Sequence, residues 1–200
     1  MDLSTERRKA PYESRDILIF APDHKKLAHI LKDHWWIEDG AKKIVAKDSL
    51  LLYPAEFAWA PDSRGFFITA GTGYTTGYEV RLYRIAEGKI ISIGGVNKTV
   101  RLDFEHRHRC FGYGIGNDPN IAGLKWLKGS ERILLTAEVP PLGICREADY
   151  FGGYEISTSS GRILRRLSPE ELAAGWSQVL GQRLIGDLEL LSPRAKSSLP

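Results

Sequence analysis

The chain has 200 residues, of which 42% are hydrophobic and 26% charged, a composition that is ordinary for a soluble globular protein with its own core. A formal net charge of +3 is too small to indicate nucleic-acid binding, for which a strong basic patch is expected. No apolar run approaches the ~20 residues of a membrane helix, and the polar N-terminus carries no signal-peptide core. We therefore expect a cytoplasmic protein without nucleic-acid or membrane contacts, or an exported one if the true start lies upstream of Met1.

Short apolar runs separated by turn signals predict a β-rich domain. Residues 1–15 are charged and aperiodic, so we expect a flexible arm there, followed by one domain over residues 16–191. Residues 27–36 can form a strand or one or two helical turns; if they are extended, the adjacent Trp35 and Trp36 point to opposite faces. The predicted strands and hairpins cover residues 16–20, 27–30, 43–46, 50–53, 57–70, 78–93, 100–110, 121–139 and 153–167.

One phrase recurs along the chain. It is clearest at Phe57-Ala-Trp59-Ala-Pro61-Asp62-Ser63, and weaker copies begin at Phe20 and Trp126. The hairpin at 153–167 also aligns with residues 78–93. The repeat unit is therefore two hairpins, or about four strands, with the period of a propeller blade.

The segment from Val100 to Cys110 alternates between apolar and charged residues, which predicts a half-buried strand. On such a strand His106, His108 and Cys110 share one face, where imidazole and thiolate can bind zinc or copper. The alternative is that these residues are partly buried and hydrogen-bonded with no metal role. A Cys–His nucleophile is a further possibility, although no local signature supplies its orienting acid or oxyanion site.

The C-terminal region changes to helical spacing. Ser168-Pro-Glu-Glu171 is a capping box with proline at the first helical position. Leu172 and Trp176 follow on one stripe, so we expect a helix over 169–180 that packs onto the sheet through Trp176. Residues 192–200 are expected to form a flexible tail.

The phrase Trp59-Ala-Pro61-Asp62-Ser63-x-x-Phe66 resembles the WSPDG-type blade motif of TolB-like and prolyl-oligopeptidase-type β-propellers. In those families the motif marks a turn between two blade strands, so the resemblance implies an architecture and no activity. Residues 136–166 also look like small bacterial proteins, which again implies no activity. Three copies are fewer than the four to eight blades that close a propeller. The predicted fold is therefore mostly β, with about three propeller-like antiparallel blade repeats, open or sandwich-like, and a C-terminal α-helix.

Other residue patterns have both structural and functional interpretations. Cys110 and Cys145 can form a disulfide in an exported protein, and are two thiols in the cytosol. The glycines of 71–77 and 112–116 lack the strand-then-helix context of phosphate loops. Six arginines could make a basic surface: Arg101, Arg107, Arg109, Arg162, Arg165 and Arg166. Asp103 and Glu105 interleave with the first three of these, which instead suits cross-strand ion pairing on a solvated face.

Aromatic residues in or beside glycine-rich loops are the remaining clue to function. They either contact a partner or plug the ends of the sheets, and they are Tyr74, Tyr78, Phe111, Tyr113, Tyr150 and Phe151. We predict a non-catalytic binding module, without a cofactor, that contacts a protein through loops 71–77, 111–120 and 140–153. The alternatives are a metal- or thiol-dependent enzyme centred on His106, His108 and Cys110, and a propeller fragment completed by self-association.

Overall fold

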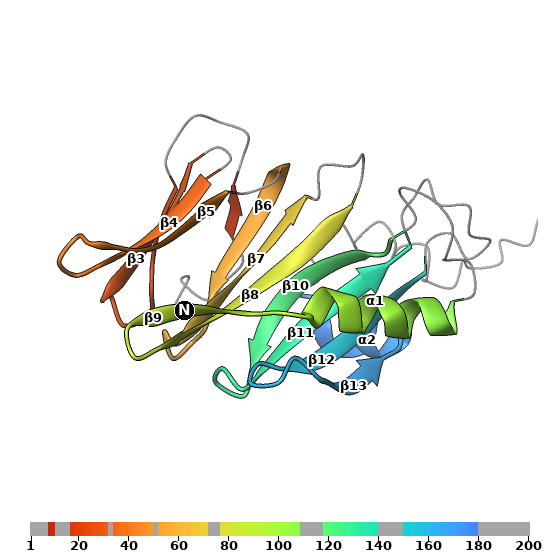
Figure 1. Ribbon diagram of the computed structural model, residues 1–200. Helices are drawn as coiled ribbons and strands as arrows, with labels where there is room; N and C mark the ends of the chain where they lie inside the picture. The colour runs from red at the N-terminus through yellow and green to blue at the C-terminus, as the bar shows by residue number, and fades with distance from the viewer. Residues whose placement is uncertain are drawn as a thin grey trace, which may run out of the picture.

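The computed structural model describes residues 8–10, 17–31, 34–49, 52–71, 77–108, 118–139 and 150–179. They form a mostly β structure of three antiparallel sheets and two helices, with the sheets following one another along the molecule (Figure 1). Each sheet contains four strands that are consecutive in the chain, each paired with the next. The meander of about four strands predicted from the repeated phrase is therefore confirmed.

The strands form three sheets, which we call the first, middle and third sheet in chain order. The first sheet contains β2 (Ile17–Phe20), β3 (Lys26–Leu31), β4 (His34–Asp39) and β5 (Ile44–Ser49). The middle sheet contains β1 (Arg8–Ala10), β6 (Leu52–Trp59), β7 (Gly65–Gly71), β8 (Tyr78–Ala86) and β9 (Lys89–Ile93). The third sheet contains β10 (Asn120–Leu127), β11 (Arg132–Glu138), β12 (Phe151–Ser157) and β13 (Ile163–Leu167).

Two details of the N-terminal half refine the sequence prediction. Residues 27–36 contribute to strands β3 and β4, so the extended interpretation holds there and the helical one does not. Residues 8–10, within the predicted arm, form β1 and pair antiparallel with β6. The remainder of 1–15 and all of 192–200 lie outside the described residues.

The repeated phrase forms the same turn in the first two sheets. In the middle sheet the Asp62 side chain accepts a hydrogen bond from the Arg64 amide at 2.9 Å, and Ser63 has a φ of 59°. In the first sheet Asp23 accepts from the Lys25 amide at 3.0 Å, and His24 has a φ of 55°. The aspartate therefore stabilises a left-handed residue in each turn. The third copy differs, because two successive residues there, Lys128 and Gly129, have positive φ.

The tryptophan of the repeated phrase links each sheet to the one before it. Trp59 donates its indole N–H to the carbonyl oxygen of Ile19 in the first sheet at 2.9 Å. Trp126 donates to the carbonyl oxygen of Ala58 in the middle sheet at 3.3 Å. Ile19 and Ala58 occupy equivalent positions, each directly before the aromatic residue of its own copy of the phrase. The same buried hydrogen bond therefore recurs at both sheet–sheet contacts.

Apolar packing follows the same order. One cluster joins the first and middle sheets and includes Trp35, Phe57 and Phe66. A second cluster joins the middle and third sheets and includes Phe67 and Trp126. The middle sheet is therefore buried on both faces, which explains why every residue of β7 is buried although a one-sided strand would alternate.

The structure corrects the strand predicted over 100–110. Val96–Arg107 form helix α1, which lies beside the contact of the middle and third sheets (Figure 1). Its buried residues Val96, Val100 and Phe104 recur every four positions, whereas Leu102, expected on the same face, is 54% exposed. A spacing of four residues fits one face of a strand and one stripe of a helix, so Val96, Val100 and Phe104 suit both, and the exposure of Leu102 is what distinguishes the helix.

Helix α1 supplies the hydrogen-bonding partners that a neighbouring strand lacks. Strand β9 pairs with β8 only from Leu82 onward, so it leaves the Val80 backbone without a strand partner on that side. The Asn97 side chain accepts from the Val80 amide at 3.0 Å and donates to the Val80 carbonyl at 2.8 Å. One amide side chain thus replaces a missing stretch of strand, as buried backbone groups require.

A charged network fixes the other end of α1 to the third sheet. Arg166 of β13 donates to both carboxylate oxygens of Asp103, and Arg107 lies 3.3 Å from the same carboxylate. Arg107 also donates to the Tyr154 hydroxyl at 2.6 Å. Hydrogen bonding from Arg166 holds the pKa of Asp103 below its ordinary value of 3.8, and burial raises the pKa of Tyr154 to about 12. Asp103 is therefore ionised and Tyr154 protonated at neutral pH.

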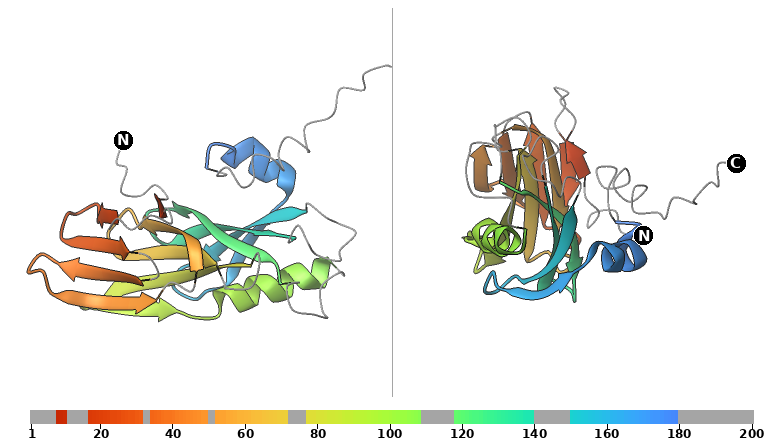
Figure 2. Two further views of the ribbon diagram at one scale, coloured as in Figure 1. Left: turned by 90° about the horizontal axis from the view of Figure 1, so that it is seen from above. Right: turned by 90° about the vertical axis from the view of Figure 1, so that its right-hand side faces the viewer.

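Helix α2 (Pro169–Trp176) covers the outer face of the third sheet, on the side opposite α1 (Figure 2). The predicted capping box is confirmed: Ser168 accepts from the Glu171 amide, and the Glu171 carboxylate accepts from the Ser168 amide. Leu172 is fully buried there, and the half-buried Trp176 packs against the same cluster, as predicted. The helix ends at Trp176, earlier than the predicted residue 180.

The indole hydrogen bonds predict a specific loss of stability. Trp59→Phe removes the donor and leaves the buried Ile19 carbonyl without it, so we expect the free energy of unfolding to fall by about 2–3 kcal/mol in urea titrations. Trp176→Phe is the matched control, since no hydrogen bond from its half-buried indole is present among the described residues, and should cost less than about 1 kcal/mol. Equal losses in the two variants would contradict the role of the hydrogen bond.

The Asp103 network predicts an acid-sensitive contribution to stability. Because the folded-state pKa lies below 3.8, the contribution is present above that pH and is lost as the pH falls through the folded-state pKa. Asp103→Asn should therefore lose less stability than the wild type when urea titrations at pH 5 and pH 2.5 are compared. Asp118→Asn, which removes a carboxylate that is 73% exposed, is the control. An Asp103→Asn variant with the full wild-type acid dependence would contradict the assignment.

Candidate binding cleft

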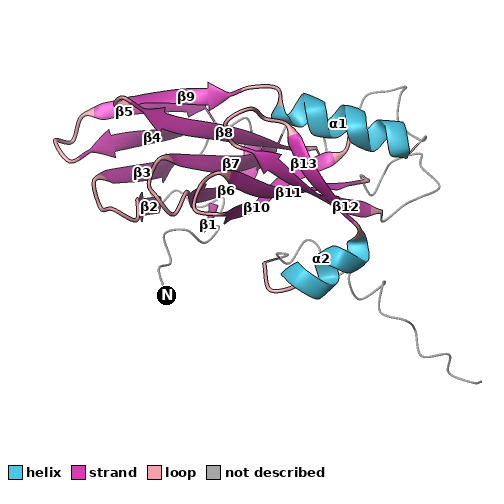
Figure 3. Cartoon of the chain, turned by 90° about the horizontal axis from the view of Figure 1, so that it is seen from below, coloured by secondary structure: helices cyan, strands magenta, loops and turns pink. Residues whose placement is uncertain are grey.

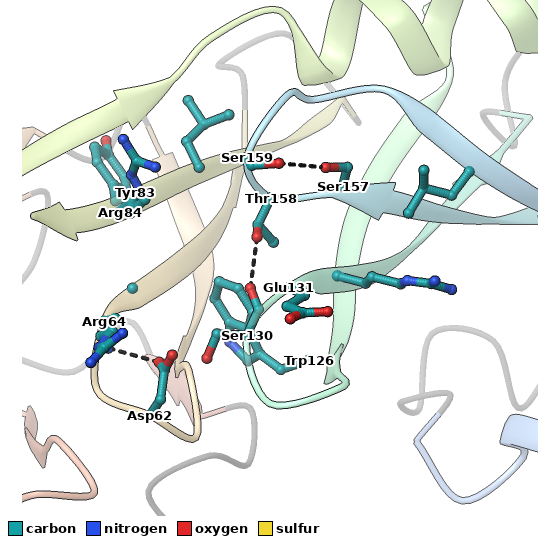
Figure 4. Close-up of a pocket in the computed structure, with 14 residues that line it drawn as sticks. Asp62, Arg64, Tyr83, Arg84, Trp126, Ser130, Glu131, Ser157, Thr158 and Ser159 are labelled. Carbon is teal, nitrogen blue, oxygen red and sulfur yellow. Dashed lines mark hydrogen bonds between the residues drawn. The ribbon is translucent and has the colours of Figure 1, made fainter.

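A cleft of about 600 Å³ lies between the middle and third sheets, at the end where their strand-connecting turns gather (Figure 4). We call it the turn-end cleft. Its middle-sheet wall is formed by Asp62, Arg64, Gly65, Tyr83, Arg84 and Ile93. Its third-sheet wall is formed by Trp126, Ser130, Glu131, Arg132, Ser157, Thr158, Ser159 and Leu164. The volume lies within the range of small-molecule and peptide-side-chain sites.

Gly65 allows strands β7 and β8 of the middle sheet to lie close together beside the cleft. A Cβ atom at this position would lie 2.6 Å from the Tyr83 carbonyl oxygen and 3.5 Å from the Trp126 ring. The first distance is shorter than any ordinary contact, and the second is a normal one. Glycine therefore lets β7 pass against β8 while the Trp126 indole remains hydrogen-bonded to Ala58.

The cleft carries charges that no side chain in the described part of the chain neutralises. Arg64 and Arg84 are exposed, and their guanidinium groups make no ion pair with any residue that the structure describes. Glu131 on the opposite wall is likewise exposed and without an ion-pair partner among the described residues. Arg132 differs, because it is engaged by Glu155 at 3.2 Å. Two cations on one wall thus face one carboxylate on the other.

Hydroxyl groups make the third-sheet wall polar and rigid. Thr158 donates its hydroxyl to the Ser130 carbonyl at 2.6 Å, and its amide donates to the Glu131 carbonyl at 3.0 Å, so the β10–β11 and β12–β13 turns are tied together. Burial raises the pKa of the Tyr83 hydroxyl above 10.0, against the opposing effect of Arg81, so this group is neutral at physiological pH. The cleft therefore combines fixed charges with neutral hydrogen-bonding groups.

The histidines and cysteine singled out in the sequence do not share a strand face. His106 is exposed near the end of α1, whereas His108 is 7% exposed and its ring lies 3.9 Å from that of Tyr150. Cys110 and Cys145 lie outside the described residues, so the disulfide stays a prediction. No group of three or more His, Cys, Asp or Glu side chains suited to a metal occurs in the described part of the chain. The geometric premise of the metal hypothesis, a strand over 100–110, is wrong.

The structure places the aromatic residues predicted for the loops in different environments. Phe151 is a residue of β12 and is 1% exposed in the core beneath α2, so the expectation of an exposed loop aromatic is wrong for it. Tyr150 is half-buried and packs beside Phe104 and His108, and Tyr78 is half-buried at the start of β8. Tyr74, Phe111 and Tyr113 lie outside the described residues. Both described tyrosines are at the opposite end of the strands from the turn-end cleft.

Four of the arginines suggested as a basic surface are engaged by acids. Arg107 and Arg166 contact Asp103, Arg101 contacts Asp118, and Arg165 contacts Glu171. The ion-pairing interpretation, which concerned Arg101, Arg107 and Arg109, is the correct one for the first two, although these residues lie on a helix in place of the predicted strand. Arg162 is exposed, and Arg109 lies outside the described residues.

Sequence reasoning missed the turn-end cleft. Its residues were visible only as parts of a turn motif, and no pattern in the chain indicates that three turns from two of the repeats meet at one end. Arg64, which has no ion-pair partner among the residues that the structure describes, lies inside the best copy of the repeated phrase and is the one signal that could have indicated a site. A structural motif requires no cation at that position.

No protein-family model matches this chain, and a comparison with curated protein sequences also finds no match. Of the helices in the described part of the chain, neither has the length and hydropathy that crossing a membrane requires.

The close approach at Gly65 predicts a stability effect. Gly65→Ala places a methyl group against the Tyr83 carbonyl, so we expect the free energy of unfolding to fall by about 1–3 kcal/mol in urea titrations. Gly94→Ala is the matched control, because a Cβ there meets nothing within 4 Å and its φ is not in the left-handed region. A Gly65→Ala variant as stable as the Gly94→Ala variant would contradict this account of the cleft.

Proposed function

We propose that this protein is a non-catalytic binding module whose turn-end cleft takes a carboxylate-bearing segment of a protein partner. The observation that carries the proposal is the pair of unneutralised guanidinium groups, Arg64 and Arg84, on one wall of a cleft of about 600 Å³. Guanidinium groups bind carboxylates through paired, charge-assisted hydrogen bonds. A side-chain or terminal carboxylate of a peptide supplies that group.

The opposite wall narrows the class of ligand. Glu131 faces a bound segment with a negative charge and so disfavours a uniformly anionic polymer. The hydroxyls of Ser157 and Ser159, the Trp126 ring and the Leu164 side chain offer neutral polar and apolar contacts. A polypeptide segment that carries one carboxylate beside uncharged side chains fits this combination best.

The architecture supports binding through turns. We propose that the three sheets are propeller-type blades in an open stack, on the strength of their matching meanders, their shared turn and their repeated indole hydrogen bonds. In that arrangement the connections at one end of neighbouring blades form a common surface. The cleft uses the β6–β7, β10–β11 and β12–β13 turns, at the opposite end from the loops that sequence reasoning favoured.

A displayed library of random peptides tests the proposal. We expect wild-type protein to enrich peptides with Asp or Glu beside neutral residues. Synthetic versions of these peptides should bind the Arg64→Ala/Arg84→Ala double variant at least ~10-fold more weakly in fluorescence anisotropy, a difference of about 1.4 kcal/mol. Both side chains are exposed, so the double variant should fold normally, which circular dichroism checks.

Lys98→Ala is the control for loss of positive charge, because Lys98 is exposed on α1 and is not part of the cleft. It should bind the selected peptides like the wild type. Failure to enrich any peptide, or equal affinity of the double variant and the wild type, would overturn the proposed function.

A further inference from the structure

In the middle and third sheets, one of the two faces is covered by the sheet that comes before it in the chain. In the middle sheet the side chains Trp59, Phe66 and Tyr83 lie opposite one another in a cross-strand row. All three belong to the cluster buried against the first sheet. This row therefore points toward the preceding sheet.

The third sheet repeats the arrangement. Trp126, Ile133 and Ile156 form the corresponding cross-strand row. All three are buried in the cluster shared with the middle sheet, which precedes the third. In both the middle and the third sheet, the row that begins at the aromatic residue of the repeated phrase therefore packs against the preceding sheet.

The first sheet carries the same row, but no described sheet precedes it. The row consists of Phe20, Leu27, Glu38 and Ile44. Phe20, the equivalent of Trp59 and Trp126, is 50% exposed, and Ile44 is 52% exposed. We call the face that this row shares with Leu18, His29, Trp36 and Lys47 the first-sheet outer face.

This face is the main apolar surface of the described part of the chain. Leu18, Phe20 and Ile44 all lie on it, and they make up three of the six large hydrophobic side chains that are exposed there. The remaining three lie on separate elements: Ile91 on β9, Leu102 on α1 and Leu164 on β13. Clustering of this kind marks an interaction surface, whereas scattered exposed residues do not.

The polar groups on the face are preorganised. The Trp36 indole donates to the Glu38 carboxylate at 3.2 Å, and the His29 ring stacks on Trp36 with centroids 4.5 Å apart. His29 also lies 3.2 Å from Glu38. The largest aromatic side chain of the face is thereby held in one orientation, so that it can pack against a partner with little further loss of side-chain freedom.

The opposite end of the stack is closed. Helix α2 lies on the outer side of the third sheet (Figure 3). Its Leu172 packs so tightly on Gly153 that an added Cβ would lie 2.7 Å from the Leu172 side chain. Another chain therefore cannot add its first sheet onto this third sheet and so continue the stack. Among the described faces, the first-sheet outer face can meet only another first-sheet outer face.

We infer that two copies of this chain associate through their first-sheet outer faces, sheet against sheet, about a two-fold axis. Such an isologous contact closes at a dimer and does not propagate. The face carries one carboxylate, Glu38, and one ammonium group, Lys47, so a two-fold partner can set opposite charges against each other. Two apolar sheet faces packed about 10 Å apart are an ordinary arrangement in β-sandwiches.

The size of the face sets the strength of the association. Four strands spaced by about 4.8 Å, with six residues of about 3.3 Å each, give a footprint of roughly 400 Å² per copy. The sum for two copies falls below the ~1,200 Å² that stable complexes bury. The dimer is therefore weak and reversible.

Sedimentation velocity over about 5 to 500 µM tests the inference. We expect the wild-type sedimentation coefficient to rise from the monomer to the dimer value. Phe20→Glu should weaken association at least ~10-fold, because it places a charge on the row of side chains that forms the contact. Leu102→Glu is the matched control, since Leu102 is 54% exposed but lies on α1, and it should dimerise like the wild type.

Ile44→Lys is a second variant on the same row, in case Phe20→Glu disturbs β2. Association lost in both variants, with unchanged circular dichroism, supports the inference. A wild type that stays monomeric throughout overturns it, whether the face is free or covered by another part of the chain. A dimer that both variants retain also overturns it.

Discussion

The hydrogen bond between an indole N–H and a backbone carbonyl of the preceding sheet is the contact on which the stack depends. It is made by Trp59 to Ile19 and by Trp126 to Ala58. Burying an aromatic side chain between two sheets removes a large apolar area from water, but it also buries the indole donor. The carbonyl before the neighbouring aromatic satisfies that donor and fixes where along the strand the sheets meet. One tryptophan in each of these two repeats thus contributes both to the packing between the sheets and to the position at which the sheets meet.

The outer faces of the first and third described sheets differ. Helix α2, started by the capping box at Ser168 and Glu171, covers the last sheet. The first sheet retains Phe20 at the position where later repeats have tryptophan. Unlike tryptophan, a phenylalanine side chain has no N–H donor. It can therefore be buried against a second copy of the same face without a hydrogen-bond acceptor there. The residue at the open end therefore agrees with a contact that is apolar and reversible.

Local chemistry was readable from the sequence where a single motif decides the structure. The Pro-Asp turns, the hairpins and the Ser168 capping box depend on residues within a few positions of one another, and each is present. Helix α1 was not readable, because Val100 and Phe104 fit a strand face and a helical stripe equally well. What selects the helix is distant: Asn97 bonds the Val80 backbone, and Asp103 meets Arg166. The turn-end cleft was missed for the same reason, since Arg64 and Glu131 are brought together only by the packing of two sheets.

The rate at which the indole protons exchange with solvent tests the central claim most directly. In a two-dimensional NMR spectrum of ¹⁵N-labelled protein in D₂O, the Nε1–H signals of Trp59 and Trp126 should persist longer than the signal of Trp176. The reason is that both indoles are buried hydrogen-bond donors at sheet–sheet contacts. Trp→Phe variants assign each signal. Signals of Trp59 and Trp126 that vanish as fast as that of Trp176 would show that these indoles do not join the sheets, and would contradict the account.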